Sequence, residues 1–129
     1  MFARLLLYVD ERPESLAAAG PALRLARLCD ARLFAVSVVP ESPNSRRRRR
    51  REPGSEPEEQ AWSRLYEIED DAFEQEVKIS LLLESGSRDE RILALIDSYQ
   101  ADALILGSRS LAGWEQLIER CSKPVILLR

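Results

Sequence analysis

The sequence contains no histidine among its 129 residues. This absence removes the commonest acid–base group near neutral pH, the Ser–His and Cys–His nucleophile pairs, and zinc sites built on imidazole. Carboxylates and lysine remain, but no arrangement of them is recognisable as an activated nucleophile or a metal cluster. We therefore expect no catalytic residue, no metal site and no enzymatic activity.

Cysteine and long apolar runs are also scarce. The two cysteines, Cys29 and Cys121, lie far apart in the sequence, which favours core thiols in a reducing cytoplasm over a disulfide or a metal site. No apolar run approaches the roughly 20 residues that span a bilayer. The run that follows Met1 stops at Asp10 without a small-residue cleavage site, which indicates a strand and no signal peptide. We expect a cytoplasmic protein that makes no membrane contact.

Short apolar segments predict five buried strands, at residues 5–9, 33–39, 79–83, 103–106 and 125–128. Between them, helical spacing of apolar residues predicts four helices, at residues 15–29, 57–77, 87–99 and 111–121. Gly20-Pro21 should kink or delay the first helix. Ser87 and Glu90 have the spacing of a capping box, and Ser110 is placed to cap the last helix.

The alternation of strands and helices, without hairpin signals, predicts the fold class. Right-handed crossovers between consecutive strands give an α/β three-layer sandwich, with a five-stranded parallel sheet covered on both faces by four helices. The length suits one domain that spans residues 1–129. Periodicity alone leaves the strand order open.

Four phrases of the sequence resemble the universal stress protein family. They are LLYVD at residues 6–10, AVSVV at 35–39, ADALILGS at 101–108 and CSKPVILL at 121–128. The resemblance extends over nearly the whole chain except residues 40–56. It implies strand order 3-2-1-4-5, a cytoplasmic homodimer and a stress-linked regulatory role, often with an adenine nucleotide bound.

The family's phosphate-binding motif, which follows the fourth strand, is broken in this sequence. Gly107 matches its first glycine, but Ser110 stands at the second, and Arg120-Cys121 stand where a glycine and a Ser or Thr are expected. A helix over 111–121 would also leave little loop to wrap a triphosphate. By resemblance, Asp10 and Val39 match positions that contact ribose or adenine.

If nucleotide binding is retained, ligands should bind beyond the carboxyl ends of the strands, where the strand order reverses. The candidate residues are Asp10, Val39, Gly107, Ser108, Arg109 and Ser110. Glu11 and Arg12 also line that crevice. The simpler interpretation is that Asp10 caps a loop and Val39 fills the core.

Residues 40–56 form a Pro-, Ser- and Gly-containing segment with six consecutive arginines, which predicts a disordered Arg-rich loop. The run could bind RNA or polyphosphate through charge density alone, and no aromatic residue is interleaved for base stacking. The candidate polyanion-binding residues are Arg46, Arg47, Arg48, Arg49, Arg50 and Arg51. The alternative is a solvated loop with no ligand.

The last strand predicts a dimer edge, because an apolar strand that ends the chain would invite aggregation if it were left bare. Its residues are Val125, Ile126, Leu127 and Leu128. Three functions therefore remain open. The first is a non-catalytic regulatory domain that acts through homodimerisation and an unidentified protein partner, with no cofactor and with nucleotide binding lost or weak. The others are an ATP- or AMP-binding stress protein and a polyanion-binding module.

Overall fold

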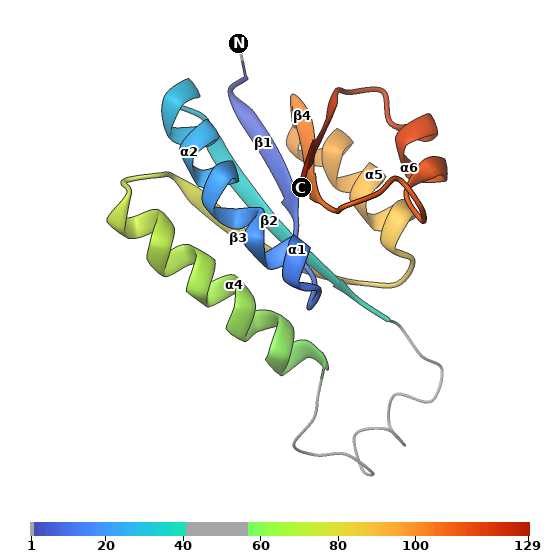
Figure 1. Cartoon of the computed structure of the whole chain (residues 1–129), viewed down its shortest axis with the longest axis horizontal. Helices are drawn as coiled ribbons and strands as arrows, with labels where there is room; N and C mark the ends of the chain where they lie inside the picture. Colours follow the sequence, from blue (N-terminus) through green and yellow to red (C-terminus); the bar gives the residue numbers. More distant parts are fainter. Residues whose placement is uncertain (1, 41–56) are drawn as a thin grey trace.

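A computed structural model of the chain describes residues 2–40 and 57–129, and it contains one parallel sheet (Figure 1). The strands are β1 (Arg4–Tyr8), β2 (Arg32–Val39), β3 (Ile79–Ser85), β4 (Ala103–Gly107) and β5 (Val125–Leu128). Their order across the sheet is β3-β2-β1-β4-β5, and every neighbouring pair is parallel. The predicted fold class and strand order are confirmed.

Four helical connections join these strands, as predicted, and the first is divided into two helices. The helices are α1 (Pro13–Ala17), α2 (Ala19–Cys29), α4 (Pro57–Glu74), α5 (Arg88–Tyr99) and α6 (Glu115–Arg120). The division falls at Ala18, just before the expected Gly20-Pro21 step. Pro21 therefore lies in the first turn of α2, where a backbone N–H has no partner within the helix and its loss costs little.

The sheet separates two apolar layers, and the side chains of β1 alternate between them. Leu5 and Leu7 pack with α2 and α4 on one face, whereas Leu6 and Tyr8 pack with α5 and α6 on the other. The leucines of β1 are completely buried, which explains why the strand is a continuous apolar run instead of an alternating one. Figure 1 shows the helices of the two layers on opposite sides of the sheet.

Two predicted side-chain caps and one predicted helix start are wrong. Ser87 is the residue before α5, but its side chain makes no capping hydrogen bond. The last helix begins at Glu115 and not at 111, and its first flanking residue is Trp114 instead of Ser110. Ser110 accepts a hydrogen bond from the N–H of Ala112 within a turn, as short polar residues often do in loops. A loop therefore precedes α6 where a helix was expected.

The start of β1 is held by Asp102, which lies just before β4. Its carboxylate accepts hydrogen bonds from the backbone N–H groups of Ala3 (2.7 Å) and Arg4 (2.8 Å). These two donors lower the pKa of Asp102, because they stabilise its charged form. The contact joins two strands that are neighbours in the sheet but distant in the sequence.

Three features of the remaining chain bear on function. The residues of β5 are half-buried, and β5 pairs with β4 at the border of the sheet. Within the described ranges, no helix has the length and apolar character needed to cross a bilayer. The predicted disorder of residues 40–56 and the run Arg46–51 concern positions 41–56, which lie outside the described residues.

Candidate functional site

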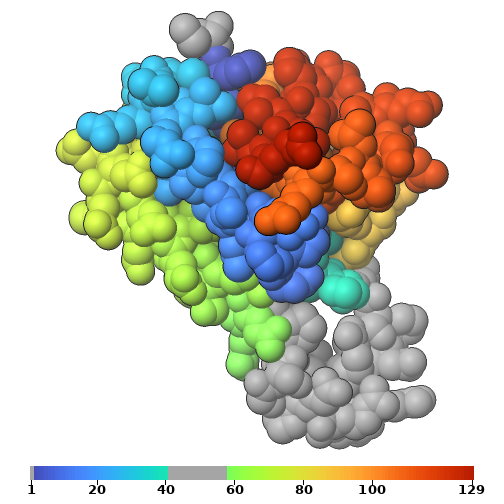
Figure 2. Space-filling model, in the orientation of Figure 1, coloured from blue at the N-terminus to red at the C-terminus, as the bar shows by residue number. Residues whose placement is uncertain are grey.

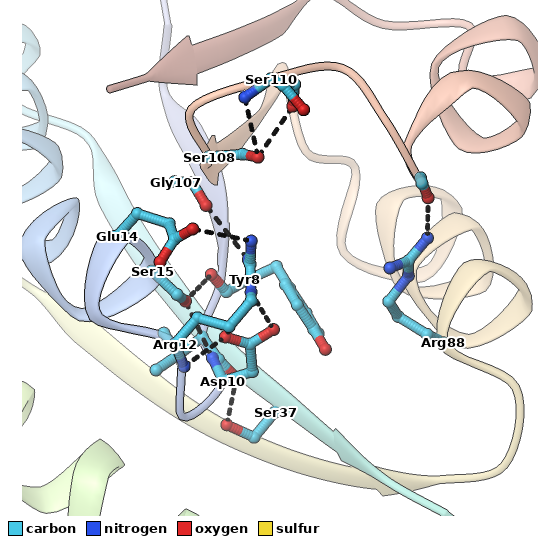
Figure 3. Close-up of polar contacts among 12 residues, drawn as sticks. Tyr8, Asp10, Arg12, Glu14, Ser15, Ser37, Arg88, Gly107, Ser108 and Ser110 are labelled. Atoms are coloured by element: carbon cyan, nitrogen blue, oxygen red, sulfur yellow. Dashed lines mark hydrogen bonds and ion pairs between the residues drawn. The ribbon is translucent and has the colours of Figure 1, made fainter.

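The candidate site lies at the carboxyl ends of β1 and β4, where the strand order reverses (Figure 3). Asp10 follows β1 and Gly107 ends β4. The backbone N–H of Asp10 donates to the hydroxyl oxygen of Ser15 (2.9 Å), and the backbone N–H of Arg12 donates to Oδ1 of Asp10 (3.0 Å). The Asp10 carboxylate thus holds the turn that leads into α1, as the loop-capping interpretation expected.

Arg12 joins the two strand ends. Its Nε donates to both carboxylate oxygens of Asp10 at 2.9 Å, and its Nη2 donates to the carbonyl oxygen of Gly107 at 3.1 Å. Figure 3 shows the guanidinium group between these two acceptors. The side chains of Arg12 and Asp10 are 29% and 17% exposed, so the pair is only partly screened by water. A ligand that used Asp10 would have to displace Arg12.

Gly107 is required for packing between α1 and the end of β4. A Cβ at this position would clash with the carbonyl oxygen of Glu14 and lie 2.7 Å from Cβ of Ala18 and 2.9 Å from Cα of Ser15. Figure 2 shows the blue segment that contains α1 against orange atoms of the region around the end of β4. The resemblance to a phosphate-loop glycine therefore has a structural explanation, because α1 fills the space that the absent side chain leaves.

The loop from Ser108 to Trp114 uses its own polar groups. The hydroxyl of Ser108 donates to the carbonyl oxygen of Ser110 (2.8 Å) and accepts a longer bond from the N–H of Ser110 (3.4 Å). Two further N–H groups are taken: that of Ala112 by the hydroxyl of Ser110, and that of Gly113 by the Glu115 carboxylate. A phosphate would need such N–H groups, so the loop as it stands is not an open cradle.

Two residues that the sequence analysis did not assign to the site, Arg88 and Trp114, belong to it. Trp114 is buried, with Tyr8 against it edge-on at 5.6 Å. The guanidinium carbons of Arg88 and Arg12 lie 3.9 and 5.3 Å from its ring centroid. Arg88 also donates to the carbonyl oxygen of Gly113 at 2.6 Å. In the sequence, Arg88 and Trp114 fall within predicted helices and carry no sign of a site. The packing of α5 against α6 brings the two side chains together.

Tyr8 lies beneath this cluster with its phenol buried. Burial, and to a lesser degree the negative charge of Asp10, raise the pKa of Tyr8. Both effects disfavour the phenolate, so the hydroxyl stays protonated throughout the physiological pH range and provides no base.

The other predicted site residues, Val39 and Arg109, also lie at or after the carboxyl ends of strands. Val39 ends β2, is buried, and accepts a hydrogen bond from the N–H of Gly86 through its carbonyl oxygen (3.0 Å). Arg109 is exposed within the loop after β4. The structure brings Asp10, Gly107, Ser108 and Ser110 to the same end of the sheet, while the Val39 side chain packs in the core.

The acidic and thiol side chains of the described residues form no group of three or more that could hold a metal ion. The side chains gathered at this end of the sheet supply the carboxylates of Asp10 and Glu14, two guanidinium groups, several serine hydroxyls and an indole face. Such a set can hold hydroxyl groups and a single anion.

Comparisons with known proteins agree with the fold and the family resemblance. The sequence matches the profile of the universal stress protein family over residues 1–129. A search of curated proteins finds no match.

Solved structures of low sequence identity share the fold. The chain is similar to universal stress protein UspA from Lactobacillus plantarum (16% identity, TM-score 0.81, covering 99% of this chain and 98% of that one). It also resembles a family protein from Arabidopsis thaliana with AMP bound (16%, 0.76, 98% and 90%). A third is the universal stress protein from Archaeoglobus fulgidus in complex with dAMP (19%, 0.74, 100% and 98%).

Proposed function

This chain belongs to the universal stress protein family, and we propose that it is a non-catalytic regulatory domain that binds a nucleoside monophosphate weakly in the crevice between β1 and β4. The observation that carries this proposal is the pairing of Asp10 with Arg12 at the reversal of strand order. A carboxylate there can accept hydrogen bonds from ribose hydroxyls, and a guanidinium beside it can hold a phosphate.

Binding is an exchange of partners in this proposal. Ribose hydroxyls replace the Arg12 N–H groups on the Asp10 carboxylate, and the freed guanidinium turns to the phosphate. One charge-assisted interaction is lost and another is gained, so the net gain is small. We expect dissociation constants near the millimolar range, equivalent to about −4 kcal/mol.

A triphosphate should gain little over a monophosphate. Phosphate groups need several converging backbone N–H donors, and the donors at Ser110, Ala112 and Gly113 already have acceptors within the loop. Two solved proteins of similar fold hold AMP and dAMP, which carry one phosphate each. We therefore propose a site of monophosphate size.

The regulatory role in this proposal rests on assembly and contacts, not on a reaction. The Ser15 and Ser108 hydroxyls are engaged by backbone groups, and the Tyr8 hydroxyl stays protonated. We propose that the protein is a cytoplasmic homodimer that pairs through β5 and acts on a protein partner according to whether the crevice is filled.

Calorimetric titration of ligand-free protein with AMP, ATP and adenosine tests the nucleotide site. We expect weak AMP binding, an ATP affinity within about threefold of that for AMP, and loss of binding in Asp10→Ala. Asp97→Ala, an exposed carboxylate on α5, is the matched control and should bind as the wild type does. AMP binding that survives in Asp10→Ala, or ATP affinity in the micromolar range, would refute this site.

A further inference from the structure

Helix α4 carries a second apolar stripe besides the one that it buries. Its buried residues are Ala61, Leu65, Ile68 and Ala72, at the spacing of one helix face. Trp62, Tyr66 and Phe73 repeat at i, i+4 and i+11, which places them together on a neighbouring face. This aromatic stripe has no role in the crevice between β1 and β4.

The aromatic stripe is largely open to solvent. Tyr66 is 53% exposed and Phe73 is 85% exposed, while Trp62 is partly buried against the core. The rings of Trp62 and Tyr66 stack with centroids 5.5 Å apart and planes 21° apart. Figure 1 shows α4 as the outer helix of its layer, with α2 on its inner side. The stacked pair is preformed, and Phe73 lies about 10 Å beyond Tyr66 along the helix axis, at about 1.5 Å per residue.

The stripe is surrounded by negative charge. Between Glu58 and Glu76 the helix region has eight acidic side chains and one basic side chain, Arg64. By helical spacing, Glu69 falls within the stripe, and Glu59 and Asp70 lie beside it. All three of these carboxylates are exposed.

This charge decides which class of partner fits. Nucleic acid and anionic lipid are repelled, because their phosphates carry the same sign as the helix. A second copy that placed its own α4 against this one would also bring like charges together. A cationic protein segment is attracted, and arginine and lysine side chains pack favourably over tryptophan and tyrosine rings.

We propose that the aromatic stripe of α4 is a docking surface for a basic segment of a partner protein, one that alternates or intersperses arginine with aliphatic residues. The cationic side chains lie over the Trp62–Tyr66 pair and reach Glu59, Glu69 and Asp70. The aliphatic side chains cover Phe73. This surface is separate from the nucleotide crevice and does not depend on it.

A peptide titration tests the proposal on the full chain. The probe is a fluorescein-labelled peptide of about ten residues that alternates arginine with leucine, followed by fluorescence anisotropy. Tyr66→Ala combined with Phe73→Ala should weaken its binding by at least about fivefold, because ring contacts are lost. Both side chains are exposed enough that the thermal melting temperature should hardly change, and the melting curve checks this.

Matched variants distinguish binding to the aromatic stripe of α4 from nonspecific binding elsewhere on the protein. Glu59→Gln, Glu69→Gln and Asp70→Asn together should weaken binding, whereas Glu90→Gln, Asp97→Asn and Glu119→Gln together remove as much exposed charge from α5 and α6 and should not. Leu111→Ala, which alters an exposed apolar side chain in the loop before α6 (55% exposed), should also leave binding unchanged. Equal losses in the α4 and control variants overturn the proposal.

Two further results bear on the outcome. A deletion variant that lacks residues 44–54 has no Arg46–51 run that could compete with the peptide. If the peptide binds neither this variant nor the wild type, the proposal is overturned. A peptide in which serine replaces leucine should bind at least about fivefold more weakly. Equal binding of the two peptides would show that apolar contact with Phe73 contributes nothing, and it would also overturn the proposal.

Discussion

The guanidinium of Arg12 is held against the carboxylate of Asp10 by two hydrogen bonds of 2.9 Å from a single Nε. The same guanidinium reaches across to the carbonyl oxygen of Gly107 at the end of β4. In the ligand-free chain, the arginine thus satisfies the groups that a ribose would otherwise use. The Arg12 side chain therefore occupies the place that a ribose would take.

Arg12→Ala should therefore change the affinities for two ligands unequally. Adenosine has no phosphate, so it only gains from the removal of a competitor, and its affinity should rise by about fivefold. AMP loses the guanidinium as a phosphate partner, so its gain should be smaller or reversed. Calorimetry with both ligands measures the difference, and Arg27→Ala, at an exposed position of α2, serves as the charge-matched control. An equal change for both ligands would show that Arg12 does not exchange partners.

The fold was predictable because its signals are local and repeated. The buried run at residues 5–9 and the phrase at 101–108 match β1 and β4 to within two residues at either end. The start of α6 was not predictable, because helical spacing continues from Leu111 although the chain turns through Gly113 at φ 86°. The Arg12 bridge depends on a contact across 95 positions, and no local pattern encodes such a contact.

Three glycine substitutions separate packing from backbone strain. Gly107→Ala places a methyl group against α1 and should lower the free energy of unfolding by about 2 kcal/mol. Gly113→Ala meets no atom within 4 Å, but φ is positive there, so it should cost about 1 kcal/mol. Gly20→Ala lies in α2 with its nearest neighbour at 3.7 Å and should stabilise by about 0.5–1 kcal/mol.

Chemical denaturation at constant pH measures all three. The order of stability should be Gly20→Ala first, then the wild type, then Gly113→Ala, and last Gly107→Ala. A neutral Gly107→Ala would mean that α1 moves freely away from β4, which would contradict the packing role argued for this glycine.

The carboxylate of Asp102 should make stability depend on pH at acidic values. The N–H groups of Ala3 and Arg4 lower its folded pKa below the ordinary value of 3.8. Its stabilising contribution is therefore complete above the unfolded pKa and is lost as the pH falls through the folded pKa. Asp102→Asn removes this titration, so its melting temperature should fall less steeply than that of the wild type below about pH 4. Melting curves of both proteins from pH 6 to pH 2 provide the test. If the melting temperatures fall equally steeply with pH, the hydrogen bonds from Ala3 and Arg4 to Asp102 do not stabilise the fold.

Deleting residues 44–54 should leave the melting temperature nearly unchanged, because a Pro-, Ser- and Arg-rich segment contributes little buried apolar surface. The same deletion tests the polyanion hypothesis for Arg46–51. If the wild type binds polyphosphate or RNA in a salt-dependent way and the deletion does not, the arginines form that site. A large fall in melting temperature would instead show that the segment is packed.

The last prediction concerns the border strand β5. The carbonyl oxygens of Pro124 and Leu128 accept hydrogen bonds from Leu104 and Ser108, so the even-numbered residues bond to β4. The N–H and carbonyl groups of Val125 and Leu127 then point away from β4, as alternation along a strand requires. An apolar border strand with unpaired N–H and carbonyl groups can pair with the same strand of a second copy, so we expect β5 to form the homodimer interface.

Light scattering should accordingly report a dimer for the wild type at micromolar concentration. Leu127→Pro removes one outward N–H and leaves the inward bonds of β5 in place, so it should shift the protein toward monomer. Circular dichroism must first show that the variant keeps its helices and sheet, because the Leu127 side chain also packs against the α5–α6 layer. Leu127→Ala makes the same loss of packing but keeps the N–H, and it should remain dimeric. A wild type that is monomeric throughout, or two variants that dissociate equally, would mean that backbone pairing through β5 does not hold the dimer.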